Sequence, residues 1–186
     1  MTSVFIAGSR KLSRLNEQVQ KRLENVMAGS YMVLVGDANG ADKAVQKFLF
    51  ERNYRNVTVY CSGSVCRNNL GNWEGHHVEV DPKISGRDFY TKKDIEMAAV
   101  ADYGLMIWDG KSPGTINNVL ELVKRDKKAL VYLSSLKQFL AVSSLEDINQ
   151  LMSHCSDDDF KLITRKTGLN SKLRDLAQSN QHALGF

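Results

Sequence analysis

The sequence predicts a three-layer α/β/α fold, an open and mostly parallel sheet with helices on both faces. Short apolar runs alternate with amphipathic segments over the first 133 residues, in the β-α-β order of a parallel sheet. The apolar runs are nearly continuous, as expected for strands that are buried on both faces. Glycine-bearing loops follow three of the runs, where open parallel sheets of this Rossmann-like type bind ligands.

The first half of the pattern contains three strands and two helices. Strands are predicted at 4–7, 31–35 and 57–60, each a short apolar run. Between the first two, apolar residues recur at three- and four-residue steps over 12–26, which is the period of a helix with one buried face. A second helical pattern covers 44–49.

The second half begins with a long segment, 61–88, that has no clear period and several glycines. We expect a loop there, and long loops inside compact domains are often functional. A helix is predicted over 89–101 with Ile95, Ala98 and Ala99 turned inward, followed by a strand at 103–108. A helix at 116–124 and a fifth strand at 129–133 complete the alternation.

The alternation ends near residue 134, which divides the chain into two expected parts. Residues 1–134 form the Rossmann-like ligand-binding domain, and residues 135–186 form a small helical extension packed on it. Helix starts are expected at Ser144 and Ser156. Five basic and no acidic residues lie between Lys161 and Arg174. This basic segment is interpreted as a solvated face, with a sheet-edge cover, a dimer interface or a polyanion contact as alternatives.

Composition excludes several classes of protein. No apolar run approaches the roughly 20 residues of a membrane span, and the beginning of the chain does not resemble a signal peptide. The net charge of +4 is compatible with anionic ligands but does not by itself indicate nucleic acid. Three cysteines without metal-type spacing favour free thiols in a reducing cytoplasm. We therefore expect a cytoplasmic protein with no membrane partner.

The most informative stretch is Trp108–Asn118, which joins a predicted strand to a predicted helix. Its loop of small residues ends in Gly114-Thr115 at the helix start. The first N–H groups of a helix lack internal partners, and the helix dipole favours negative charge there. Hydroxyls of Ser112 and Thr115 can add hydrogen bonds. The stretch therefore predicts a site for a phosphate group.

Several charged residues near the three glycine loops have both a binding and a structural interpretation. Arg10 is expected to contact an anion, with a surface cation as its alternative. Asp42 either binds ribose or caps the following helix, and Asp109 either binds ribose or forms a turn before glycine. Lys111 either supplies charge to the phosphate or is a solvated loop residue.

Other residues are assigned mainly structural roles. Trp108 is interpreted as core rather than as a platform for base stacking. Cys66, Glu74 and the His76-His77 pair match no zinc spacing, so we expect no metal site and no cofactor. Tyr90 and Asp94 begin the helix after the long loop and are secondary candidates for the pocket.

With these residues in view, the chain resembles the SLOG superfamily of Rossmann-like proteins. The matching pieces are Gly8-Ser9-Arg10, the loop from Gly36 to Asp42 and the loop from Asp109 to Thr115. The second loop is similar to the family's G-G-A-x-G-A-D motif, with Asp37 where glycine is usual. The resemblance is closest to a small single-domain branch from bacteria and phages. It implies a nucleotide-type ligand and a homodimer.

The same resemblance raises the question of catalysis. In the lonely-guy phosphoribohydrolases and the similar deoxyribosyltransferases, a carboxylate stands two or three residues beyond the Gly-Thr. Here those positions hold Asn117 and Asn118, and an amide cannot take a proton or form a glycosyl ester. Glu121, one turn from Asn117, is a candidate replacement, and Asp37 is a second. Catalysis, if any, would be cleavage of an N-glycosidic bond.

The sequence therefore predicts binding of a nucleotide or a nucleotide-derived ligand such as a nucleoside phosphate or an ADP-ribose-like molecule. The alternative, which the sequence does not favour, is nucleic-acid binding of the DNA-processing protein A type through the basic extension. The expected catalytic candidates are Glu121 and Asp37. The expected ligand-binding residues are Gly8, Ser9, Arg10, Gly36, Asn39, Gly40, Asp42, Asp109, Lys111, Ser112, Gly114, Thr115 and Asn117.

Overall fold

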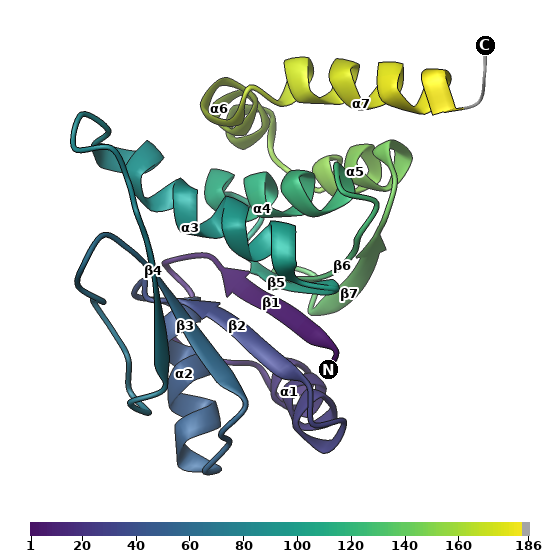
Figure 1. Ribbon diagram of the computed structural model, residues 1–186. Helices are drawn as coiled ribbons and strands as arrows, with labels where there is room; N and C mark the ends of the chain where they lie inside the picture. The colour runs from purple at the N-terminus through teal and green to yellow at the C-terminus, as the bar shows by residue number, and fades with distance from the viewer. Residues whose placement is uncertain (184–186) are drawn as a thin grey trace.

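The computed structural model describes residues 1–183 and contains one seven-stranded sheet in the order β4-β3-β2-β1-β5-β6-β7 (Figure 1). All neighbouring strands are parallel except β6 and β7. The strands are β1 (Ser3–Gly8), β2 (Met32–Gly36), β3 (Val57–Ser62), β4 (Glu74–Val78), β5 (Tyr103–Trp108), β6 (Lys128–Leu133) and β7 (Gln138–Val142). The helices are α1 (Glu17–Ala28), α2 (Ala41–Glu51), α3 (Gly86–Val100), α4 (Pro113–Val123), α5 (Leu145–Met152), α6 (Asp157–Thr167) and α7 (Leu169–Ala183).

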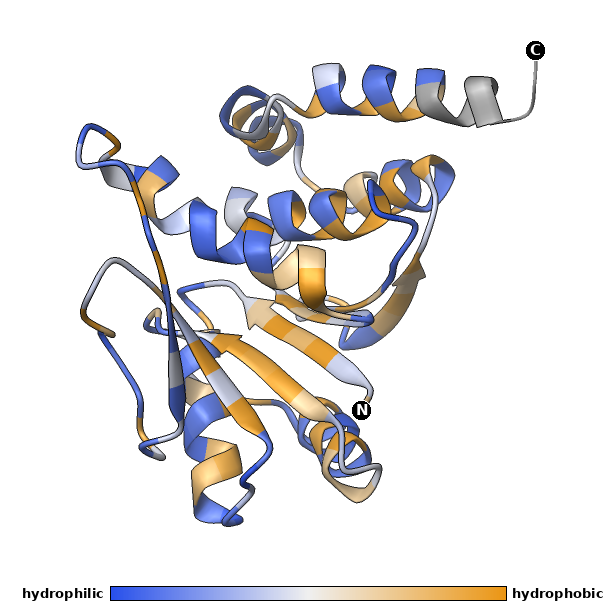
Figure 2. Ribbon diagram, in the orientation of Figure 1, coloured by the Kyte–Doolittle hydropathy of each residue, from blue (hydrophilic) through white to orange (hydrophobic). Residues whose placement is uncertain are grey.

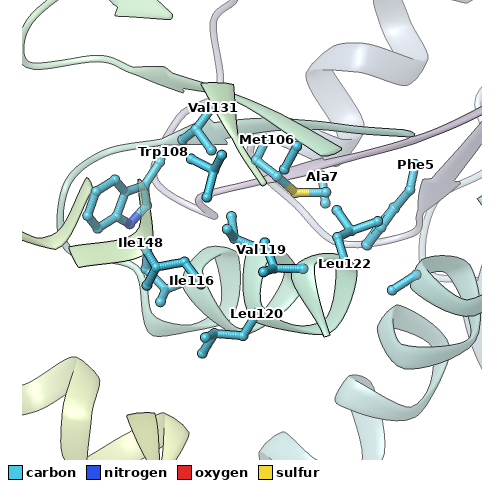
Figure 3. Packing of buried hydrophobic residues seen from close by; sticks show 14 of the residues in the cluster. Phe5, Ala7, Met106, Trp108, Ile116, Val119, Leu120, Leu122, Val131 and Ile148 are labelled. Atoms are coloured by element: carbon cyan, nitrogen blue, oxygen red, sulfur yellow. The ribbon is translucent and has the colours of Figure 1, made fainter. Parts of the chain in front are cut away.

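Helices cover both faces of the sheet and enclose two separate apolar cores. Helices α1 and α2 lie on one face, and α3, α4 and α5 lie on the other (Figure 1). In the second core, Met106 of β5 and Val131 of β6 pack against Val119 and Leu122 of α4 (Figure 3). The predicted fold class, a Rossmann-like α/β/α sheet with a C-terminal helical extension, is confirmed.

Two edge strands were not predicted. The segment expected to be a loop, 61–88, contains β4, whose residues are mostly exposed and polar, so it lacks the apolar run of a buried strand. Strand β7 lies in the expected helical extension and pairs antiparallel with β6. The boundary expected at residue 134 therefore falls between two paired strands, and the extension continues the sheet before it becomes helical.

The helix over 89–101 was also predicted with an inward face that is partly wrong. The buried side chains of α3 are Lys93, Met97 and Ala98, whereas Ala99 is exposed and Ile95 is only partly buried. The helix starts earlier than expected, at Gly86. Because the polar residue Lys93 lies on the buried face of α3, the apolar residues of this face do not recur at helical spacing in the sequence.

The end of the chain forms a further layer over α3 and α4. In Figure 1, α6 lies above α3 and α4, and α7 extends over α5; the side of α7 that faces the body of the protein is partly apolar in Figure 2. As a result, all of Thr115–Val123 in α4 is buried, although the helix carries polar residues on its outer side. Residues 184–186 of the expected extension lie outside the described residues.

The cysteines and the membrane prediction can be compared with the structure directly. Cys61 and Cys66 form a disulfide, so the expectation of free thiols is wrong for this pair. Cys155 is free and partly buried. Within residues 1–183, no helix combines the length and the apolar character needed to cross a membrane.

Candidate functional site

A cleft of about 700 Å³ lies at the carboxyl ends of the central strands, where the fold predicts a ligand. Its walls come from the loops after β1, β2, β3 and β5, from α3, from the first turns of α4, and from α6 of the extension. The lining residues are Ala7, Gly8, Arg10, Lys11, Ala38, Asp42, Arg67, Gly86, Arg87, Tyr90, Thr91, Lys93, Asp94, Asp109, Lys111, Ser112, Pro113, Gly114, Thr115, Asn118, Asp159, Leu162 and Lys166. Among these described residues, seven basic side chains face four acidic ones.

Ser9 and Asp109 fix the two loops that flank the base of the cleft. The Ser9 hydroxyl donates to Asp109 Oδ1 at 2.9 Å and accepts from the Asp109 backbone N–H at 3.1 Å. The same carboxylate accepts from the N–H groups of Lys111 and Ser112 at 3.0 and 2.8 Å. Asp109 thus lines the cleft while it shapes its own loop, as expected for aspartate in a turn.

The start of α4 presents uncapped backbone to the cleft. Ser112 is the N-cap residue, but its side chain makes no capping hydrogen bond. A Cβ atom added at Gly114 would meet only the Ser112 hydroxyl, at 3.9 Å, so the space in front of this residue is open. The helix dipole and the first N–H groups of α4 therefore face an open volume that suits an anion.

Asn118 lies one turn into α4 and also lines the cleft. The residue is 4% exposed, and within the described part of the chain its Oδ1 atom has no hydrogen-bond partner. Leaving a buried polar atom unpaired costs about 1–3 kcal/mol, so such atoms call for an explanation. The Oδ1 atom has less than 1 Å² of accessible surface, so a donor in the cleft would supply the missing partner once the Asn118 side chain turns this oxygen toward it.

On the other side of the cleft, Asp37 is neutralised by Arg67. Asp37 is 2% exposed, and its carboxylate accepts from Arg67 Nε at 3.0 Å and from Arg67 Nη2 at 2.5 Å. The Arg67 backbone N–H adds a third bond at 3.0 Å. Burial alone would raise the pKa of Asp37, but the hydrogen bonds from Arg67 outweigh it and hold the pKa below its usual value.

Beneath this pair, Lys93 and Asp42 are buried beside Gly36. Lys93 Nζ lies 2.6 Å from Asp94 Oδ1. Burial raises the pKa of Asp42 to about 6, although the charge of Lys93 opposes the shift. Burial would lower the pKa of Lys93, but the nearby carboxylates of Asp94 and Asp42 raise it. Any side chain at Gly36 would collide with both Lys93 and Asp42, which explains the glycine at the end of β2.

Tyr90 of α3 joins the two arginines at the mouth of the cleft. The Arg67 guanidinium lies 4.1 Å from the centre of the Tyr90 ring, and the Arg10 guanidinium lies 5.5 Å from it. Such contacts hold an arginine side chain in place while leaving its N–H groups available. Nearby, Arg87 donates to the backbone carbonyl of Lys166 at 2.8 Å, which connects α3 to α6.

Asn117 and Glu121 lie outside the cleft lining. Lys172 of α7 donates to Asn117 Oδ1 at 2.6 Å and lies 3.1 Å from Glu121 Oε1. Arg125 Nη1 lies 2.7 Å from Glu121 Oε2. Burial would raise the pKa of Glu121, but the hydrogen bonds from Arg125 and Lys172 outweigh it and lower the pKa. These two residues of α4 therefore anchor α7.

The structure brings together eight of the thirteen residues expected to bind ligand. These eight line the cleft, as do the secondary candidates Tyr90 and Asp94; the eight are Gly8, Arg10, Asp42, Asp109, Lys111, Ser112, Gly114 and Thr115.

The remaining expected residues have other places. Ser9 and Gly36 are buried beneath the cleft. Gly40 has a φ of +86°, and a Cβ atom there would collide with the Arg10 backbone. Asn68 Nδ2 donates to Asn39 Oδ1 at 3.1 Å. Trp108 is fully buried in the core, and its Nε1 donates to the Ser112 carbonyl at 3.2 Å.

Sequence reasoning missed several lining residues. Asn118 is four residues from Gly114, so helical spacing would have placed it on the ligand side in preference to Asn117. Arg67 and Arg87 lie in the segment without periodicity, and Lys166 lies in the extension, so nothing local connected them to the glycine loops. Lys93 had no signal, because a buried lysine is identified only by its partners.

Comparisons with known proteins indicate a fold and no closer relationship. Neither a scan against models of protein families nor a search of curated proteins finds a match. Among solved structures, the chain is similar to DNA processing protein A from Helicobacter pylori, described for its unique single-stranded DNA binding mode. That similarity has a TM-score of 0.56 with 15% sequence identity, and it covers 94% of this chain and 81% of the other. At this identity, the likeness shows that the two proteins share a Rossmann-like fold.

Proposed function

We propose that the cleft binds a nucleotide or a nucleotide-derived ligand, with a phosphate at the start of α4. The observation that carries this proposal is the pairing of an uncapped helix start with Asn118, whose buried Oδ1 has no partner and which lines the same cleft. The helix start suits the phosphate, and the amide oxygen suits a donor such as a ribose hydroxyl or a base N–H.

The size and the charge of the cleft agree with such a ligand. Small-molecule sites commonly measure about 300–1,000 Å³, and this cleft measures about 700 Å³. Arg10 and Lys111 are exposed residues of the cleft lining, in which basic residues outnumber acidic ones. Lys111 Nζ lies 3.7 Å from Asp159 Oδ2 at an exposed position. A phosphate that contacts either side chain would gain charge-assisted hydrogen bonds.

Binding fits the site better than hydrolysis does. Cleavage of an N-glycosidic bond needs a carboxylate that is free to act on the sugar or on water. Asp37 is held by Arg67, and Glu121 faces Lys172 and Arg125 outside the cleft lining. The acidic residues that do line the cleft are also engaged, as with Asp94 by Lys93 and Asp109 by its own loop.

Single-stranded nucleic acid is a second candidate ligand. It is supported by the likeness in fold to a protein described for binding single-stranded DNA, and by basic residues that extend from the cleft onto α6. Lys161 and Arg165 of α6 are exposed and lie outside the cleft lining. A nucleic-acid strand would use these residues, whereas a mononucleotide would not reach them.

A thermal-shift experiment separates the two candidates. The probes are ADP, ADP-ribose, a cyclic dinucleotide, inorganic phosphate and a short oligothymidine. We expect at least one nucleotide to raise the Tm by several degrees at saturation, and Gly114→Asp to abolish this rise. The aspartate fits the open space and suits a helix start, so the fold is retained while an anion is repelled.

Lys21→Ala removes an exposed cation on α1, away from the cleft, and is the matched control. No response to any nucleotide, or an equal response in Gly114→Asp, would contradict nucleotide binding. A response to the oligothymidine alone, reduced in the Lys161→Ala/Arg165→Ala variant and steeply dependent on salt, would favour nucleic acid. The homodimer suggested by the family resemblance belongs to the same proposal and is tested by light scattering.

A further inference from the structure

Cys61, Cys66 and His77 lie together at the sheet edge, away from the start of α4. Cys61 of β3 and His77 of β4 are directly paired in the register of the two parallel strands. Cys66 comes from the loop between these strands and packs against the same core as Cys61. Their sulfur atoms and a ring nitrogen of His77 all lie within 4.8 Å of one another.

The His77 ring is held in the orientation that a metal ligand needs. Its Nδ1 lies 3.0 Å from the carbonyl oxygen of Gly63, and because a carbonyl only accepts, Nδ1 carries the proton. Nε2 is then the basic nitrogen. A carbonyl on the second ring nitrogen is the usual support for a metal-binding histidine, because it fixes the tautomer and the direction of the ring.

Gly75 leaves room beside the three ligand atoms. A Cβ atom at this position would lie 3.3 Å from His77 Nε2 and 3.7 Å from Cys66 Sγ. Tetrahedral zinc has bonds of about 2.3 Å to sulfur and about 2.0 Å to nitrogen. The ligand atoms of such an ion are therefore about 3.5–3.8 Å apart, within reach of the present spacing once the sulfur atoms separate.

We propose that reduced Cys61 and Cys66, together with His77, bind one thiophilic divalent ion such as Zn²⁺, with water in the fourth position. The disulfide seen in the structure is the metal-free state of this site. A dithiol reductant supplies two electrons and two protons, breaks the S–S bond and becomes a disulfide itself. Metal binding then releases the two thiol protons, because thiolates are the ligands.

The site adjoins the cleft through the chain itself. Arg67 directly follows Cys66, and its guanidinium binds Asp37 and stacks on Tyr90. The loop that carries Arg67 is therefore held to β3 by the disulfide in one state, and to β3 and β4 by bonds to the metal in the other. The metal proposal does not depend on the identity of the ligand in the cleft.

Cobalt titration of the reduced protein tests the proposal directly. The whole chain is reduced, freed of reductant without oxygen and titrated with Co²⁺. We expect one Co²⁺ per chain, with thiolate charge-transfer absorption and the intense visible bands of a tetrahedral site, all displaced by Zn²⁺. Cys66→Ser should remove the charge-transfer signal of its thiolate, and His77→Ala should weaken binding at least about tenfold.

Cys155→Ser is the matched control, because Cys155 lies elsewhere, with its Sγ 3.4 Å from the Gly110 carbonyl oxygen. Its titration should equal that of the unaltered protein, and the oxidised protein should give no thiolate signal. Circular dichroism verifies that the His77→Ala and Cys66→Ser variants are folded. The proposal is overturned if the reduced protein binds no Co²⁺, or if Cys66→Ser and His77→Ala bind it as the unaltered protein does.

Discussion

The two sides of the cleft differ in how their polar groups are satisfied. At the end of β2, Asp37 is paired with Arg67, and Lys93 is paired with Asp94. At the start of α4, the helix has no side-chain cap and Asn118 Oδ1 has no partner. The first side is complete without a ligand, whereas the second is not. Charge in a cleft therefore indicates structure as readily as binding. Among the described residues, the buried side-chain atoms without a partner are Ser62 Oγ, Thr164 Oγ1 and Asn118 Oδ1, and of these residues Asn118 is the one that lines the cleft.

The largest expected effect on stability comes from removing the ion pair between Asp37 and Arg67 at the end of β2. Arg67→Ala leaves the carboxylate of Asp37 buried without its partner, and we expect the free energy of unfolding to fall by about 3 kcal/mol. Urea unfolding measures this change. The double variant Asp37→Asn/Arg67→Ala removes the buried charge as well and should recover much of the loss. A loss below about 0.5 kcal/mol for Arg67→Ala would contradict the assignment.

The buried Asp42 gives the same side a pH dependence. Its pKa rises from 3.8 to about 6 on folding, so the folded state binds the proton more tightly than the unfolded state. Its contribution to stability is therefore full below about pH 4 and is lost as the pH rises through about 6. The difference amounts to about 3 kcal/mol at neutral pH.

Asp42→Asn removes this titration. Urea unfolding between about pH 4 and pH 7 should show that the unaltered protein loses stability relative to the variant as the pH rises. Asp37, whose pKa is lowered, acts in the opposite sense at lower pH in both proteins and cancels in the comparison. Parallel stability curves for the two proteins would show that Asp42 titrates normally.

A substitution at Asn118, on the side of the cleft proposed to bind ligand, should leave the stability of the protein almost unchanged. Asn118→Ala removes a polar atom that has no partner, so we expect the free energy of unfolding to change by less than about 1 kcal/mol. Affinity for the nucleotide found by thermal shift should fall about five- to tenfold, because one hydrogen bond to the ligand is lost. Calorimetric titration measures the affinity, and an unchanged value would remove Asn118 from the binding site.

Breaking the contact between α4 and α7 should have a small effect on stability and the smallest effect on binding. Lys172→Ala removes the partner of Asn117 and one of the two partners of Glu121, while Arg125 remains. Because Lys172 is partly exposed, we expect a loss of about 1 kcal/mol in stability and no change in nucleotide affinity. A clear loss of affinity would mean that Asn117 and Glu121 belong to the site after all.

The sequence predicted what local patterns encode. The buried strands, such as β5 and β6, were found because their apolar runs are continuous. Strands β4 and β7 were missed because edge strands need no such run. The start of α4 was predicted from Gly114-Thr115, whereas Asn117 and not Asn118 was expected to contact the ligand, although Asn118 is the one of the two that lines the cleft.

What the sequence could not predict depends on contacts between distant segments. Asp37 and Arg67 are thirty residues apart, and their ion pair depends on the path of the 63–73 loop. The disulfide between Cys61 and Cys66 forms because the same loop folds back to the end of β3, and no local pattern in the sequence predicts this path. The cover of α4 by α6 and α7 converted an apparently solvated polar face into an interhelical contact.

The central claim, that the start of α4 receives the phosphate of a nucleotide, is tested most directly by the backbone amide signals in an NMR titration. A nucleotide that raises the Tm should shift the Gly114 and Thr115 amide resonances in a saturable way, with smaller changes around Asp37. Inorganic phosphate should move the same two signals more weakly. Saturable shifts confined to other parts of the protein, with Gly114 and Thr115 unmoved, would contradict the claim.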